Sequence, residues 1–246
     1  PAQMAREIRS YGANLVVSPA GDGVLTDEAV AAATSMVPSG ALVGSAAFDY
    51  ETVTINDQPY VAGGTDLAAV RSMNPYWYVD GQWPGESGQV LVGEQIASTI
   101  DVKTGSTITI SQLDGSASAK AAQAQAQVGA APQASTSHDA ATQSGASTSP
   151  ATQGPQSGAG TQGSAQASAL EPDPRSVTLT VSGILKTGGN EDGYVYMSTQ
   201  DMDALTGTSG TVSLAEYSIA LEGNALSAVA DGMNAANPDI HAQTVR

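Results

Sequence analysis

The sequence predicts an α+β protein, because short apolar stretches with strand periodicity alternate along it with stretches of helical periodicity. A long polar tract, residues 115–169, interrupts this pattern and contains one large apolar residue, Val128. The segments on either side of it, residues 89–110 and 177–197, read as two halves of one small β-rich unit. We therefore expect the tract to be an insertion within a domain rather than a linker between domains.

The first block of the chain predicts two helices and several strands. Met4, Ile8 and Tyr11 recur at helical spacing before Gly12, which suits a helix C-terminus. Thr26 is a candidate N-cap for a second helix. That helix is expected at about residues 26–37, with strands at residues 14–17, 40–47 and 52–55, the last turning through residues 56–57 into residues 60–61.

The middle and last blocks are expected to begin near residues 67 and 210. The middle block has strand signals at residues 90–92, 107–110, 177–184 and 194–197, and helix signals at residues 93–100 and 199–205. Ser198 or Thr199 can cap the second of these helices, and Gly207 can end it. In the last block a strand is expected at residues 215–221 and a helix at about residues 225–235. Pro238 marks the exit of that helix, and an extended tail follows.

Both tryptophans and two of the eight tyrosines fall within residues 76–84. Such a cluster can stack on a sugar or a nucleotide, or it can fill the core of a domain that is poor in aromatic residues. Aromatic residues make up only 4% of this chain. We therefore favour the core interpretation.

The composition excludes several classes of protein. The chain has 246 residues, with 24 acidic residues against 8 basic ones and a net charge of −16. Nucleic-acid binding requires a basic surface, so no nucleic-acid partner is expected. The absence of cysteine removes disulfide frameworks and thiolate chemistry. No run is long and apolar enough for a membrane span and no signal peptide is visible, and the start at Pro1 suggests a piece of a longer product.

The residues that could carry catalysis are few. The two histidines are His138, inside the tract, and His241, near the end of the chain. Paired carboxylates could in principle support glycoside hydrolysis, and the candidate pairs are Asp49 with Glu51 and Glu191 with Asp192. Neither pair has a spacing that suggests a compelling geometry. We predict no catalytic, cofactor-binding or metal-binding residues, no cofactor and no enzymatic activity.

Two polar segments have structural interpretations. The loop at residues 187–193 superficially resembles a calcium site, but it lacks the alternating acidic spacing and the distal Glu of an EF-hand. A structural turn is favoured there. The tract would cost about 1–2 kcal/mol per residue to order, with almost nothing to bury in return. It is therefore expected to be disordered, and it could act as a spacer, carry glycans or be an unselected expansion.

Five motifs outside the tract occur in an order that is typical of one family. The first, at residues 8–17 (IRSYGANLVV), resembles the start of the extracytoplasmic domain of MacB/FtsX-type ABC transporter permeases, after the first membrane helix. Further similarities follow in the family's order, and together with the first they cover nearly everything outside the tract: residues 63–66 with 77–83, residues 90–97, residues 103–110, and residues 181–184 with 187–192. The tract is the departure, since it replaces what is usually a short connection.

The resemblance implies a MacB-like periplasmic core domain inserted between the first and second membrane helices of a permease. A membrane-proximal, porter-like α/β subdomain would comprise residues 1–66 and 210–246. A β-rich, sabre-like outer subdomain would comprise residues 67–209, with the 115–170 loop inside it. Both chain ends should then lie on one side of the domain, facing the membrane.

The resemblance also implies function, location and partners. It implies a non-enzymatic domain on the extracytoplasmic side of a cell membrane that couples cytoplasmic ATP hydrolysis to export or mechanotransmission. The partners would be a second permease copy or paralogue, a cytoplasmic ABC ATPase subunit, and an extracytoplasmic protein, peptide or small-molecule substrate. The functional surfaces would be a stalk around Arg6 and Arg9 and the dimer-facing side of the porter-like block. An alternative is a regulatory ectodomain that binds and activates a cell-wall hydrolase or another envelope protein.

Overall fold

The computed structural model describes residues 12–113 and 175–245, which all belong to one compact unit of the chain. A second unit, Ala122–Asp173, lies wholly outside the described residues, as does the predicted first helix. The described elements are, in order, β1 (Leu15–Pro19), β2 (Leu25–Thr26), α2 (Asp27–Ser35), β3 (Leu42–Ile55), β4 (Gln58–Thr65), α3 (Leu67–Met73), β5 (Tyr78–Gly81), β6 (Gln89–Gly93), α4 (Glu94–Ile100), β7 (Thr107–Gln112), β8 (Ser176–Lys186), η1 (Asn190–Gly193), β9 (Tyr194–Ser198), α6 (Thr199–Thr206), β10 (Thr211–Val212), β11 (Leu214–Ile219), α7 (Gly223–Ala236) and β12 (Ile240–Thr244).

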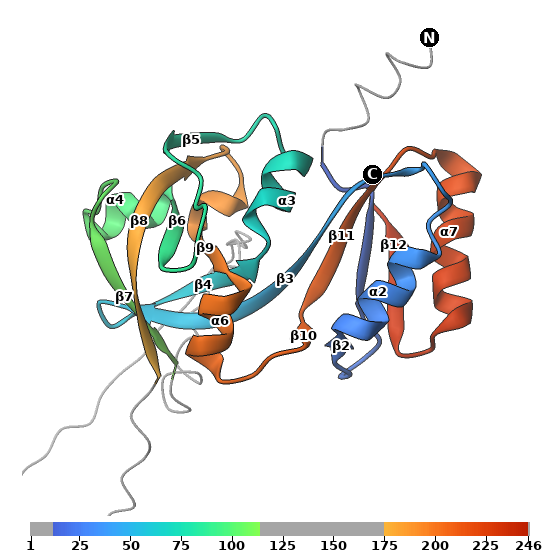
Figure 1. The fold of residues 1–246 in the computed structure, drawn as a ribbon, viewed down its shortest axis with the longest axis horizontal. Coiled ribbons are helices and arrows are strands. Elements are labelled where there is room, and N and C mark those ends of the chain that lie inside the picture. Colours follow the sequence, from blue (N-terminus) through green and yellow to red (C-terminus); the bar gives the residue numbers. More distant parts are fainter. Residues whose placement is uncertain (1–11, 114–174, 246) are drawn as a thin grey trace, which may run out of the picture. The chain divides into compact units, whose positions relative to one another are not determined.

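The fold is mixed α+β, as the sequence predicts. Ten strands form one large sheet in the order β12-β1-β11-β3-β4-β9-β6-β8-β5, with β7 paired to both β3 and β8 (Figure 1). Two of its pairings, β4 with β9 and β6 with β8, are parallel. The others are antiparallel, and β2 and β10 form a separate two-stranded sheet.

Strand β3 corrects the prediction of two strands at residues 40–47 and 52–55, because it runs unbroken through both. Its first half pairs with β11 and its second half pairs with β4. The polar residues Asp49 and Glu51 suggested a break, but they alternate with Phe48 and Tyr50 and keep the period of a strand. The turn at Asn56 and Asp57 is where the sequence places it, and both residues have the positive φ of a tight hairpin turn, 51° and 61°.

The predicted β-rich unit is confirmed by the pairing of β6, β7, β8 and β9. Strand β8 lies between β6 and β7, and β6 also pairs with β9. Ser111 pairs with Ser176, so the chain leaves β7 and returns into β8 at the same point. The two halves therefore fold together across the tract, whose predicted disorder concerns residues outside the described ranges.

Helix boundaries follow the capping residues that the sequence indicates. The Thr26 hydroxyl accepts a hydrogen bond from the Ala29 amide at 3.1 Å and begins α2. Ser198 caps α6, and Gly207 ends that helix with a left-handed φ of 71°. Helix α3, capped by Asp66, was not anticipated.

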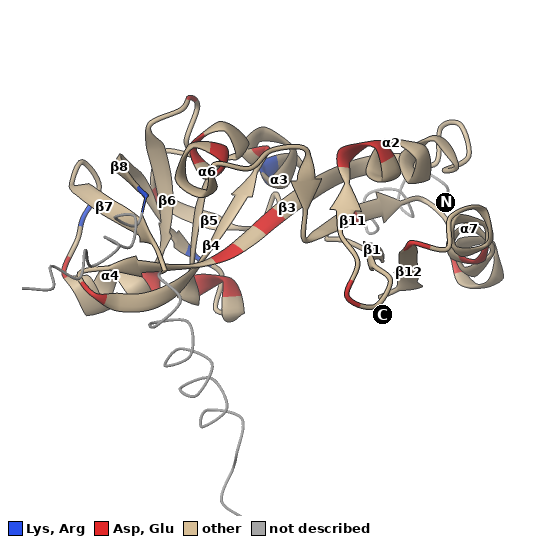
Figure 2. Ribbon diagram, turned by 90° about the horizontal axis from the view of Figure 1, so that it is seen from below, with Lys and Arg blue, Asp and Glu red and all other residues tan. Residues whose placement is uncertain are grey.

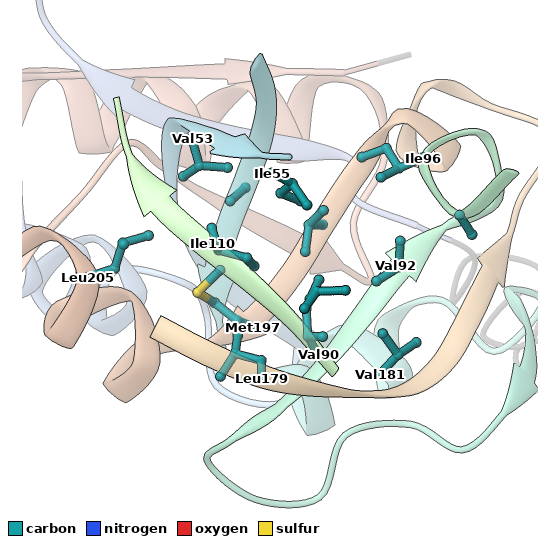
Figure 3. Packing of buried hydrophobic residues seen from close by; sticks show 14 of the residues in the cluster. Val53, Ile55, Val90, Val92, Ile96, Ile110, Leu179, Val181, Met197 and Leu205 are labelled. Atoms are coloured by element: carbon teal, nitrogen blue, oxygen red, sulfur yellow. The ribbon is translucent and has the colours of Figure 1, made fainter. Parts of the chain in front are cut away.

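Apolar side chains gather in three clusters. One combines the ends of β3 and β4 with β6 to β9, α4 and α6; it includes Val53, Val90, Ile110, Val181 and Met197 (Figure 3). A second lies under α2 and α7, against β1, β11 and β12, and a third packs α3 beside the middle of β3. Strand β3 contributes to all three. The division into subdomains at residues 66 and 210 stays a prediction.

Candidate functional site

The two ends of the described chain meet at one edge of the sheet. Strand β12 pairs antiparallel with β1, with Leu15 opposite Thr244, and the Val245 amide donates to the Asn14 carbonyl at 2.9 Å. The Asn14 side chain also bonds both backbone groups of Ile219, donating to its carbonyl at 2.7 Å and accepting from its amide at 2.9 Å. The chain therefore enters and leaves this fold at one place. The stalk residues Arg6 and Arg9 lie outside the described residues.

One face of β3 carries an aromatic cluster. The rings of Phe48 and Tyr50 stack with centroids 5.4 Å apart, and Tyr194 and Tyr196 on β9 complete the group. Burial raises the pKa of both Tyr50 and Tyr196 well above the ordinary value. These phenols stay neutral at any physiological pH, so they serve packing rather than proton transfer.

The aromatic-rich segment at residues 76–84 divides between core and surface. Trp77 and Trp83 stack at 6.4 Å and pack against the cluster around Phe48 and Tyr196. Tyr76 and Tyr78, by contrast, are 57% and 62% exposed. The tryptophans thus fit the core interpretation.

The opposite face of β3 carries Asp49 and Glu51, which point the same way because they are two residues apart on a strand. Burial raises the pKa of Asp49 above its ordinary value, and the charges of Asp203 and Asp27 add to this, while a hydrogen bond from Ser213 opposes it. Burial and Asp49 raise the pKa of Glu51. Acidic residues on β3 are visible in Figure 2. The charges that shift the pKa of Asp49 and Glu51 all come from acidic side chains, so none of them favours the ionised form of either carboxyl.

The second carboxylate pair does not act as a pair. Asp192 is buried, and its carboxylate accepts hydrogen bonds from the Thr187 amide and hydroxyl and from the Gly188 amide, at 2.6, 2.9 and 2.9 Å. Glu191 accepts separately from the Thr187 hydroxyl at 3.3 Å. The Asp192 oxygens are occupied by the loop's own donors, which is the bonding of a structural turn rather than of a calcium loop.

Other candidate chemistry is sparse in the described ranges. No group of three or more Asp, Glu or His side chains there could hold a metal ion. His241 is exposed on β12, and His138 lies outside the described residues. Nor does any helix in those ranges have the length and hydropathy that crossing a membrane would require.

The larger of two described pockets, about 440 Å³, is framed by β5, α4, β8 and the turn after α4. We name it the β5–α4 pocket, and it is lined by Asp80, Glu94, Ala97, Ser98, Asp101, Val102, Lys103, Thr104, Ile184 and Lys186. An ion pair of 3.1 Å joins Lys186 to Glu94 and raises the pKa of Lys186. Sequence reasoning missed this pocket because its walls come from three segments that only the sheet brings together.

A smaller pocket, about 360 Å³, lies where the N-termini of α3 and α6 meet residues 84–87. Asp201 holds this region together, since its carboxylate accepts from the Ser87 hydroxyl at 2.6 Å and from the Gly88 amide at 2.9 Å. Asp66 already caps the first amides of α3, at 3.0 and 3.1 Å. The polar groups of this pocket are thus largely satisfied from within.

Comparison with known proteins gives structural matches alone. No family model matches the chain, and no curated protein matches it. The periplasmic region of MacB from Actinobacillus actinomycetemcomitans matches with a TM-score of 0.51 and 8% identity, over 98% of this chain and 94% of that one. The extracellular domain of the ABC-type transporter YknZ from Gram-positive bacteria has a TM-score of 0.47 and 10% identity, over 94% and 99% of the two chains. A permease domain from Porphyromonas gingivalis has a TM-score of 0.41 and 8% identity, over 96% of this chain and 90% of that one.

At such identities only the fold can be compared, and the MacB match extends over nearly the whole of both chains. The resemblance found in the sequence motifs is therefore confirmed at the level of the fold: this chain folds like the periplasmic region of MacB.

Proposed function

We propose that this chain is the extracytoplasmic domain of a MacB/FtsX-type ABC permease, inserted between two membrane helices. The observation that carries the proposal is the bond between Val245 and Asn14, which brings the two ends of the described chain together. A domain inserted into a membrane segment must begin and end on the side that faces the membrane. The shared fold with the MacB periplasmic region supports the same assignment.

In this proposal the domain transmits motion and catalyses nothing. ATP hydrolysis belongs to a cytoplasmic ABC subunit, and the domain opens and closes against a second permease copy or paralogue. The β1, β11, β12, α2 and α7 core would be the porter-like subdomain beside the membrane, and the core around β6 to β9 the sabre-like outer one. Strand β3 contributes to both cores, so a displacement of one is passed to the other through a hydrogen-bonded strand.

Cysteine accessibility in the full-length protein tests the location, since this chain has no cysteine. Val24→Cys places a thiol where the native side chain is 62% exposed, and Met233→Cys places one at a fully buried position as a control. A membrane-impermeant maleimide should label the Val24 variant in intact cells and leave the Met233 variant unlabelled. Labelling of the Val24 variant only after permeabilisation would refute the extracytoplasmic location.

Coupling is tested separately in the complete transporter reconstituted with its ATPase. Removing the domain should abolish stimulation of ATP hydrolysis by the exported substrate and leave basal hydrolysis in place. If stimulation persists and the domain instead captures a cell-wall hydrolase, the regulatory function replaces export.

A further inference from the structure

The β5–α4 pocket concentrates charge of both signs on a chain that is mostly acidic. The described part of the chain has four basic residues, Arg71, Lys103, Arg175 and Lys186, and two of them line this pocket. Three carboxylates, Asp80, Glu94 and Asp101, share its wall. Random placement on so acidic a surface does not favour such a grouping of lysines.

The internal ion pair decides which charges remain for a ligand. Lys186 and Glu94 neutralise each other at 3.1 Å. Lys103 makes no ion pair within the described residues, and Asp80 and Asp101 are exposed. The pocket thus offers the ammonium of Lys103 and the exposed carboxylates of Asp80 and Asp101 beside the apolar side chains of Val102 and Ile184. Of these carboxylates, Asp80 also lies near enough to Lys186 to raise the pKa of that lysine.

An unpaired strand edge borders the same pocket. Within the described ranges β5 is the last strand of the sheet and pairs only with β8. The Gln82 amide donates a hydrogen bond to the Ser182 carbonyl, so the backbone groups of Gln82 face β8. Residues of an antiparallel pair alternate in this respect, so the backbone N–H and C=O of Asp80 also face β8, while those of Val79 point away from β8 at the free edge. Tyr78, 62% exposed, shares the face of Asp80. An extended peptide can bond to the backbone of a free strand edge and also place its two charged termini on the pocket's ammonium and carboxylates. A zwitterion without a peptide backbone could use the charges alone.

We propose that the β5–α4 pocket binds a short extended peptide with both termini free, its carboxylate on Lys103 and its ammonium on Asp80 and Asp101. The peptide backbone lies along the free edge of β5, and Tyr78 covers one of its side chains. The inference stands on the pocket alone and does not depend on the function proposed above.

Equilibrium dialysis of the 246-residue chain against a mixture of random tetrapeptides at 1 mM, read by mass spectrometry, tests this site. The native chain should retain a subset of the peptides. Lys103→Met and the double variant Asp80→Asn/Asp101→Asn should each reduce retention roughly tenfold, the effect of one charge-assisted contact. Arg71→Met, outside the pocket, is the matched control and should change nothing. Asn is chosen at position 101 because it tolerates the left-handed φ of 53° there.

Blocked peptides separate the two charges. The native chain should not retain peptides that are acetylated at the N-terminus, nor peptides that are amidated at the C-terminus. The proposal is overturned if the native chain retains no tetrapeptide, if blocked peptides are retained as well as free ones, or if either pocket variant binds like the native chain. A thermal melt establishes that the variants are folded, as expected for exposed side chains.

Discussion

The backbone amide of Val245 donates a hydrogen bond of 2.9 Å to the carbonyl of Asn14, so the last strand of the chain closes on the first. Asn14 then reaches across to Ile219 with both polar atoms of its side chain. A single residue therefore joins β12, β1 and the end of β11. This junction is where the proposed insertion into the membrane helices would transmit force.

Replacing Asn14 with Ala should destabilise the domain by about 1–3 kcal/mol, because two partly buried backbone groups of Ile219 lose their partner. Urea unfolding followed by circular dichroism measures the change. Asn14→Asp is the informative comparison, since it keeps the acceptor for the Ile219 amide and loses the donor to the Ile219 carbonyl. Its free energy of unfolding should lie between those of the native chain and Asn14→Ala. Equal stability of Asn14→Ala and the native chain would contradict this role.

Gly93→Ala should cost about 2–4 kcal/mol, because a methyl group there would meet the backbone of Asp192 at the end of β6. Backbone cannot rotate away as a side chain can. Gly85→Ala is the matched control, since nothing lies within 4 Å of a methyl group there and its φ is not positive. Thermal unfolding should separate the two variants clearly.

Asp192→Ala should destabilise the domain by about 2–3 kcal/mol, since it removes the acceptor of three hydrogen bonds within the 187–193 loop. Millimolar calcium should leave the melting temperature of the native chain unchanged, because the carboxylate is already engaged. A calcium-dependent rise in melting temperature would establish the loop as a metal site after all.

Alkaline pH should destabilise the fold through Tyr50 and Tyr196. Their folded-state pKa values are raised above the ordinary value of 10, so the folded state holds protons that the unfolded chain releases. The contribution of these two tyrosines to the free energy of unfolding is therefore fully present below pH 10 and decreases as the pH rises above 10. A Tyr50→Phe/Tyr196→Phe variant should lose less stability than the native chain when the pH is raised from about 9 to about 11. Absorbance at the phenolate band would show whether the native pair ionises only with unfolding.

Near neutral pH the charged carboxylate of Asp49 lowers the stability of the fold, whereas a carboxylate in an ion pair would raise it. Its folded pKa is raised above 3.8, so its contribution to stability starts to fall as the pH rises past 3.8 and is fully lost above the folded value. Asp49→Asn should stabilise the domain slightly at pH 7, by at most about 0.5 kcal/mol because solvent screens this partly exposed carboxyl, and the gain should vanish below pH 4. Asp22→Asn, which makes the same substitution at an exposed position, is the matched control.

Local signals predicted most of the strands and helices, and their failures have physical reasons. Thr26, Ser198 and Gly207 marked helix ends because capping depends on residues adjacent in sequence. The two-residue strands β2 and β10 pair only with each other, so neither shows a periodicity of its own. The extended tail was foreseen, but its pairing with β1 was not, because a strand partner at the far end of the chain leaves no local trace.

The candidate sites likewise divide into features that neighbouring residues reveal and features that depend on residues far apart in the chain. The absence of cysteine and the placing of both histidines were read directly from the residues, as was the structural nature of the 187–193 turn. The β5–α4 pocket could not be read in this way, since Asp80 and Lys186 are distant in sequence and meet only through the pairing of β5 with β8. The turn that carries Lys103 reaches β8 separately, through the bond from the Gly105 amide to the Val181 carbonyl.

By itself, the sequence determined the α+β class, most helix ends, the unity of the segments on either side of the tract, and the resemblance to a permease domain. These depend on side-chain periodicity, capping and motif order, which are properties of neighbouring residues. Only the tertiary structure decided that β12 pairs with β1, that β3 is continuous and that charges of both signs share one pocket. Each of these depends on hydrogen bonds between strands far apart in the chain, whose energy no local pattern encodes.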